Sequence, residues 1–189
     1  MNAELHERFE DFVFARRELD RLVVDLTDER FNQRPEEGSW SIAECVDHLL
    51  VTGAKLIPRM ETAIVKARER GWLADGPFRY GALGNWFVRA SGAASLPPRS
   101  RYKAPRLYMP VRRPGRKISQ AVEDFARLQE EYLAIVRAAE GLDLARIKIA
   151  SPVTRLVRLS LGQWLASMGG HQRRHLWQAS RVRERVLGD

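Results

Sequence analysis

The 189-residue chain is 44% hydrophobic, 30% charged and 8% aromatic, and its 32 basic against 24 acidic residues give a net charge of +8. This length and balance favour one helical domain over residues 1–189, and the charged start and short apolar runs exclude a signal peptide and a membrane span, so we expect a cytoplasmic protein. Because Cys45 is the only cysteine, an internal disulfide and a thiolate metal cluster are excluded, and any metal site must use nitrogen and oxygen ligands.

The first predicted helix covers about residues 3–26. Positions three and four residues apart lie on one face of a helix, and all of them but Arg16 are apolar: Leu5, Phe9, Phe12, Arg16, Leu19, Val23 and Leu26. His6 lies among charged residues at the start of this helix, where we expect it to face solvent. Pro35 and Gly38 then mark residues 32–38 as a connection, because both residue types interrupt helices.

Ser41 and Glu44 predict the start of a second helix, because a serine followed three residues later by a glutamate forms a capping box over the first turn. Trp40, directly before the cap, is placed to pack back on that turn. We expect this helix to run to about residue 70 and to stop at Gly71. His48 lies on its inner side, and taken alone it is better explained as a core histidine than as a ligand.

Residues 72–115 contain six prolines and form a predicted crossing loop with a short helix over residues 83–88. Trp86 and Phe87 in that helix are placed to cover one end of the core. The stretch from Gly76 to Lys117 has no acidic residue and holds ten basic ones: Arg79, Arg89, Arg99, Arg101, Lys103, Arg106, Arg112, Arg113, Arg116 and Lys117. Much of the positive charge therefore comes from this segment, which would attract anionic molecules.

A third helix is predicted from a cap at Ser119 to a stop at Gly141. Residues 142–159 lead to the last helix and include a short strand-like passage near residues 147–153. Four long amphipathic helices joined by two long crossing segments predict an all-α four-helix bundle.

The last predicted helix starts at a second capping box at Ser160 and runs to about Val186. His171 and His175 lie one turn apart on its inner stripe, with Cβ atoms about 5 to 6 Å apart, which is close enough to bind one metal ion. Two core histidines with satisfied ring nitrogens are the alternative, and the spacing alone does not decide between them. Gln172 stands where a helical metalloprotease has its glutamate base, so that signature is absent.

Three stretches resemble the DinB-like proteins, a family that also includes bacillithiol transferases and mycothiol-dependent maleylpyruvate isomerases. Residues 40–49 (WSIAECVDHL) resemble the family's second-helix motif, and residues 170–178 (GHQRRHLWQ) resemble its fourth-helix motif. Residues 102–110 (YKAPRLYMP) are similar to its proline-bounded crossing segment. The resemblance covers nearly the whole chain and implies a four-helix bundle of the DinB-like type with long crossing connections.

Carried over position by position, the resemblance implies that His48, His171 and His175 bind one divalent metal ion, with Zn²⁺ or Ni²⁺ favoured. Three neutral imidazoles leave a position open on such an ion, which is the arrangement of a reactive site. Gln178, one turn after His175, and Glu44, one turn before His48, are candidates for orienting the ligands through hydrogen bonds. For Glu44 the capping box already provides a structural explanation.

The resemblance leaves the reaction open, because the same histidines serve hydrolases, thiol transferases and isomerases. We expect a metal-dependent hydrolase or thiol (S-)transferase that acts on a small molecule, with an anionic thiol among the candidates, and the resemblance implies a homodimer. One alternative is a non-catalytic binding or stress-response protein with a vestigial metal site, in which Trp72, Trp86 or Trp177 would serve an interface. The other is a nucleic-acid binder that uses the basic surface, although the chain has no recognised DNA-reading motif.

Overall fold

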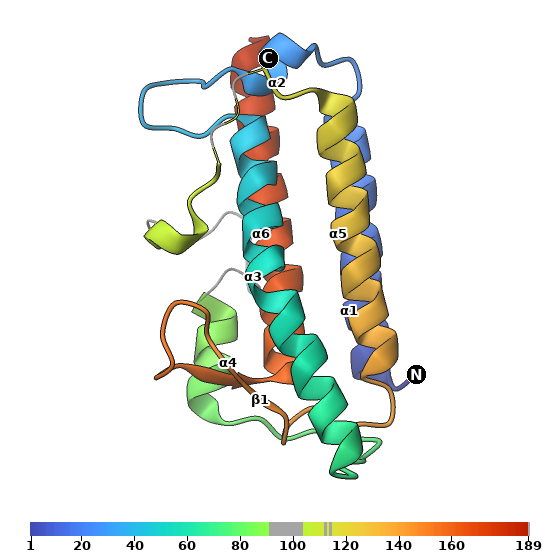
Figure 1. The fold of residues 1–189 in the computed structure, drawn as a ribbon. Coiled ribbons are helices and arrows are strands. Elements are labelled where there is room, and N and C mark those ends of the chain that lie inside the picture. The colour runs from blue at the N-terminus through green and yellow to red at the C-terminus, as the bar shows by residue number, and fades with distance from the viewer. Residues whose placement is uncertain (91–103, 112, 114, 189) are drawn as a thin grey trace.

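The computed structural model describes residues 1–90, 104–111, 113 and 115–188, and helices dominate it (Figure 1). Within these residues the elements are α1 (Ala3–Leu22), α2 (Asp28–Asn32), α3 (Ile42–Glu69), α4 (Ala82–Val88), the 3-10 turn η2 (Arg106–Tyr108), α5 (Ile118–Ala138), β1 (Lys148–Ala150), β2 (Arg158–Ser160) and α6 (Leu161–Leu187). The predicted all-α class is confirmed, and the strand-like passage corresponds in part to β1.

The four long helices α1, α3, α5 and α6 form a bundle in which α1 and α6 run in one direction and α3 and α5 run in the other (Figure 1). α1 packs against α5 and α6, and α3 packs against the same two helices. Apolar side chains from all four helices meet in the core, where Phe12 and Tyr132 stack with ring centroids 4.4 Å apart. α3 and α5 approach closely at Gly53, where an added Cβ would lie 2.3 Å from Leu128 Cδ1. The contacts of α3 with α6 place these two helices directly beside each other.

The two long connections follow different paths. Arg68 in the last turn of α3 donates to the carbonyls of Ala138 and Glu140 at 2.9 and 3.1 Å, so α3 and α5 finish at the same end of the bundle. The start of α5 therefore lies at the opposite end of the bundle from the end of α3, as the predicted returning connection requires. Residues 139–160 instead stay at one end and fold into the antiparallel hairpin β1–β2, so the prediction of a second crossing segment is wrong (Figure 1).

Two helix boundaries differ from the sequence prediction. α1 ends before Asp25, which has a left-handed φ of 60°, and Thr27 then caps the separate helix α2. The expected continuation to residue 26 is therefore wrong. α5 begins at Ile118, with Lys117 at its N-cap position, and not after Ser119. Its first turn is capped from elsewhere in the chain, because Asp28 Oδ1 accepts a hydrogen bond from Ile118 N at 2.8 Å.

The short helix α4 lies where it was predicted, but its two aromatic residues have different surroundings. Phe87 packs edge-on against Trp164 with ring centroids 6.0 Å apart, whereas Trp86 is 59% exposed. Phe87 therefore covers the core and Trp86 does not. Trp72 is half-buried beneath the guanidinium of Arg146, which lies 4.6 Å from its ring centroid. In the described part of the chain, no helix combines the length and the apolar character needed to cross a lipid bilayer.

Candidate metal centre

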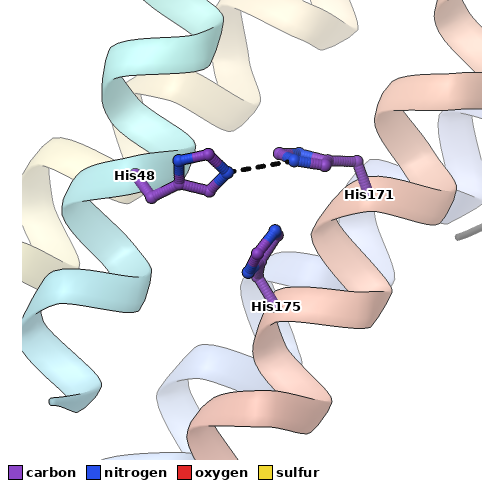
Figure 2. Close-up of side chains that lie close together, drawn as sticks. All are labelled: His48, His171 and His175. Carbon is purple, nitrogen blue, oxygen red and sulfur yellow. Dashed lines mark hydrogen bonds between the residues drawn. The ribbon is translucent and has the colours of Figure 1, made fainter. Parts of the chain in front are cut away.

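Three imidazoles from two helices converge between α3 and α6 (Figure 2). His48 extends from α3, and His171 and His175 lie one turn apart on α6 and point toward it. The ring centroids are 4.4 to 4.9 Å apart, and one nitrogen of each ring lies within 4.8 Å of the others. The distance between His48 Nε2 and His171 Nε2 is 3.1 Å. The fourth histidine, His6, is exposed, as predicted.

Both predicted capping boxes are present and determine where the two histidine helices begin. Ser41 Oγ accepts from Glu44 N at 3.2 Å, and Glu44 Oε2 accepts from Ser41 N at 2.9 Å. Ser160 and Gln163 make the same exchange at 3.3 and 3.2 Å. Because the start of each helix is defined locally, helical geometry determines which face carries each histidine.

In His48 and His175, the ring nitrogen that faces away from the cluster has a hydrogen-bond partner. His48 Nδ1 lies 2.5 Å from the carbonyl oxygen of Tyr108 in η2, and His175 Nδ1 lies 3.1 Å from Gln178 Oε1. A carbonyl oxygen can only accept, so these contacts keep the proton on Nδ1 and leave the Nε2 lone pair of each ring unprotonated. Trp40 closes one side, with its ring centroid 5.0 Å from that of His48 and 5.8 Å from that of His175.

The electrostatic environment keeps the three imidazoles neutral. Burial lowers the pKa of His48, although its hydrogen bond to Tyr108 opposes the shift. Burial, followed by the charges of His48 and Arg174, lowers the pKa of His171 to about 3. Burial, followed by the charges of His171, His48 and Arg174, holds the pKa of His175 well below its ordinary value. Neutral imidazoles have the free lone pairs that a metal ion requires.

The donor set fits a divalent transition metal. Two nitrogens bound to one tetrahedral zinc ion lie about 3.4 Å apart, given Zn–N distances of about 2.0 to 2.1 Å. The 3.1 Å between the Nε2 atoms of His48 and His171 is close to that value. Three imidazole nitrogens suit Zn²⁺ or Ni²⁺ better than the hard cations Ca²⁺ and Mg²⁺, which prefer oxygen. The cluster could therefore hold a metal ion.

Glu44 and Gln172, which were also considered from the sequence, do not belong to the group of side chains that could hold a metal ion. The Glu44 carboxylate accepts hydrogen bonds from Ser41 N and from both Nε and Nη2 of Arg34, the first of the arginine contacts being 2.8 Å. These bonds support the structural explanation for Glu44. Gln172, between the two α6 histidines, is only 2% exposed and belongs to the buried side of the helix.

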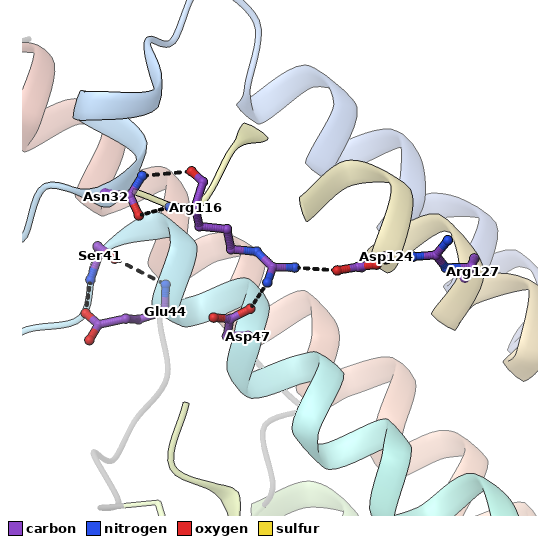
Figure 3. A network of polar contacts seen from close by, with 7 residues as sticks. All are labelled: Asn32, Ser41, Glu44, Asp47, Arg116, Asp124 and Arg127. Atoms are coloured by element: carbon purple, nitrogen blue, oxygen red, sulfur yellow. Dashed lines mark hydrogen bonds and ion pairs between the residues drawn. The ribbon is translucent and has the colours of Figure 1, made fainter. Parts of the chain in front are cut away.

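A buried ion-pair network adjoins the histidines (Figure 3). Arg116 pairs with Asp47 and Asp124 at 2.9 Å each, and its side chain is 2% exposed. Lys117 pairs with Asp28 at 2.9 Å. Two members of the acid-free basic stretch are thus neutralised by acidic residues from other elements. The predicted basic residues at positions 99, 101, 103 and 112 lie outside the described residues.

The sequence did not show that Tyr108 takes part in the site. For Trp40 it predicted only that the ring packs back on the first turn of its helix. Tyr108 contributes a main-chain carbonyl, and every residue has one, so no sequence pattern identifies it. The proximity of Trp40 to the histidine His175 depends on the packing of α6 against α3, which helical periodicity does not report.

A helical bundle with three convergent, neutral histidines defines a class of helical proteins equipped for metal binding. The chain belongs to the DinB superfamily, whose sequence profile matches residues 11–179. It is similar to the uncharacterized protein YuaE of Bacillus subtilis (strain 168), with 26% identity over 176 residues that cover 91% of this chain and 94% of that protein. No solved structure matches the chain significantly.

Proposed function

We propose that this protein is a metal-dependent enzyme that binds a divalent ion, Zn²⁺ or Ni²⁺, through His48, His171 and His175. The observation that carries the proposal is the convergence of three imidazole nitrogens within 4.8 Å of one another. Membership of the DinB superfamily supports it, because DinB-like proteins are metal-binding. The ion would act as a Lewis acid toward a small-molecule substrate or lower the pKa of a thiol or water nucleophile.

The protein residues around the histidines would orient the ligands and shield them. Gln178 Oε1 accepts from His175 Nδ1 and holds that ring with Nε2 toward the cluster. Trp40 covers His48 and His175 on one side and limits the access of water there. Arg174 contributes positive charge beside both α6 histidines, which favours an anionic group on the substrate.

The reaction we propose is hydrolysis or thiol (S-)transfer on a small molecule, with an anionic low-molecular-weight thiol as the first candidate substrate. Three protein ligands leave room on the ion for one exchangeable group, which both reactions need. Glu44 is a weaker candidate than Gln178 for supporting the ligands, because Arg34 and Ser41 already bind its carboxylate.

The test combines metal analysis with turnover assays. Elemental analysis of the purified wild-type protein should give one divalent ion per chain, and a His6→Ala variant should give the same value because His6 is exposed. A His48→Ala variant should lose the ion. Thiol transfer and ester hydrolysis would then be measured with a panel of low-molecular-weight thiols and model esters. Turnover that persists at full rate after chelation, or a metal-free wild-type protein, would contradict the proposal.

We also propose that residues 1–189 form one bundle domain and that the protein assembles as a homodimer. All four long helices share the same core, and Trp86 on α4 exposes 59% of its surface, which provides an aromatic side chain for an interface. Light scattering coupled to size-exclusion chromatography measures the mass directly. A mass near the chain's 21.7 kDa would contradict the dimer.

A further inference from the structure

His48 differs from His175 in the origin of its hydrogen-bond partner. His175 is supported by Gln178 on its own helix, three residues away. His48 Nδ1 contacts the carbonyl oxygen of Tyr108, which is 60 residues further along the chain. The rotation of the His48 ring therefore depends on how well a remote segment is held in place.

Tyr108 is held by its own 3-10 turn and by the hairpin. Its backbone N–H donates to Pro105 O at 2.8 Å, which closes η2. Its half-buried side chain lies close to that of Ser151, which follows β1 directly. Ser151 is buried and donates its backbone N–H to Val157 O at 2.8 Å, so it is part of the hairpin. The hairpin thus anchors the residue whose carbonyl meets His48.

The same returning segment is attached a second time, at Arg116, to the residue next to His48. Arg116 pairs with Asp47 at 2.9 Å, and its main chain exchanges hydrogen bonds with the amide of Asn32 at 2.9 and 3.2 Å (Figure 3). Two described positions of the segment, Tyr108 and Arg116, are therefore tied to consecutive residues of α3. This arrangement limits how far the Tyr108 carbonyl can move relative to His48.

We infer that Tyr108 is a positioning residue for the metal site: the 3-10 turn that its N–H closes, with its side chain placed beside Ser151, fixes the main-chain carbonyl that holds His48 with Nδ1 protonated and Nε2 toward His171 and His175. The inference rests on the proposed metal-binding function of these histidines. Partners that orient a ligand in this way contribute about 10- to 100-fold to metal affinity in other sites. A loosened Tyr108 would leave the ligand atoms in place on α3 and α6 but remove the restraint on one ring.

Four single variants and one double variant test the inference. Tyr108→Ala removes the whole side chain, whereas Tyr108→Phe and Ser151→Ala each delete one hydroxyl of the same side-chain contact. Tyr80→Phe is the matched control, because it also removes a half-buried tyrosine hydroxyl, which donates to Glu4 at 2.5 Å. That hydroxyl lies beside Gly162, about 13 Å along α6 from His171.

Zn²⁺ affinity would be measured by competition with a chromophoric chelator, and the His48 tautomer by ¹⁵N NMR of the metal-free protein. We expect Nδ1 to carry the proton in the wild type and in Tyr80→Phe, with equal Zn²⁺ affinities. Tyr108→Ala should weaken Zn²⁺ binding about 10- to 100-fold and give a mixture of His48 tautomers. Tyr108→Phe and Ser151→Ala should each weaken it by a similar, smaller factor, and their combination should be no worse than either one.

The inference would be overturned if metal-free wild-type His48 carried its proton on Nε2, or if Tyr108→Ala bound Zn²⁺ as tightly as Tyr80→Phe while remaining folded by circular dichroism. Additive losses in the Tyr108→Phe/Ser151→Ala double variant would also overturn it, because they would show that the two groups act separately. A wild-type protein that binds no Zn²⁺ would instead refute the proposed function. The tautomer measurement would still decide the role of Tyr108 in that case.

Discussion

Asp47 and His48 are consecutive residues of α3, and both are almost fully buried, at 4% and 3% exposure. Their surroundings differ in kind. Burial raises the pKa of Asp47, and the charge of Arg116, 2.9 Å away, acts in the opposite direction and favours the ionised form. His48 has its pKa lowered by burial and turns Nε2 toward two further neutral imidazoles.

The difference separates a structural ion pair from a histidine cluster that could hold a metal ion. In the Asp47 network, each charged group meets a group of opposite charge that the fold itself supplies, as expected of buried ions. Among the described residues, the histidine cluster brings together three nitrogen donors and no carboxylate. At 3.1 Å the Nε2 atoms of His48 and His171 can share one proton, whereas a divalent cation would bind a lone pair from each of the three rings. We therefore expect the two sites to respond in opposite ways to mutation, chelation and pH.

The largest effect on stability should come from breaking the ion pair. Arg116→Ala leaves Asp47 buried without its counter-charge and should lower the free energy of unfolding by about 3 to 5 kcal/mol. Arg127→Ala is the matched control, because Arg127 also pairs with Asp124 but is 63% exposed. Its loss should cost less than about 1 kcal/mol. Urea unfolding followed by circular dichroism measures both, and equal losses would remove the distinction between the two arginines.

Removal of the metal by a chelator should lower the free energy of unfolding by an intermediate amount. This effect should depend only on the histidine site. A ligand present at 100 times its dissociation constant stabilises the folded state by about 2.7 kcal/mol, so the metal-loaded wild type should lose about that much in chelator. A His171→Ala/His175→Ala variant should keep its helical content, bind no stoichiometric metal and be insensitive to chelator. Thermal unfolding with and without chelator provides the measurement. A variant that stays chelator-sensitive would show that these histidines are not the ligands.

The smallest effect should be the pH dependence of the metal-free protein. The unfolded histidines take up protons near pH 6.5, whereas folded His171, with its pKa lowered to about 3, stays neutral. These histidines therefore leave the free energy of unfolding at its full value well above pH 6.5 and lower it as the pH drops toward 3. Between pH 7.5 and 6 the wild type should lose about 1.5 kcal/mol more than the His171→Ala/His175→Ala variant, or about 0.8 kcal/mol per histidine. Parallel urea-unfolding curves for the two proteins would contradict the lowered pKa values.

The comparison also shows where sequence patterns are informative. Ser41 and Ser160 begin helices as predicted, because a capping box acts over four consecutive residues and is complete within the local chain. Ser119 does not begin α5, since Asp28 from another helix caps its first turn. The predicted end of α1 failed for a related reason: the apolar spacing continues to residue 26, but Asp25 turns the chain out of the helix.

The sequence by itself determined the four amphipathic helices and placed His171 and His175 on one face, because helical periodicity and capping depend on residues only a few positions apart. It did not determine that His48 meets them across the bundle; that expectation came from resemblance. Only the tertiary structure decided that the carbonyl of Tyr108 reaches His48 and that Arg116 lies against Asp47. Both contacts join residues about 60 to 70 positions apart, and their formation depends on the path of the returning segment, which no local pattern encodes.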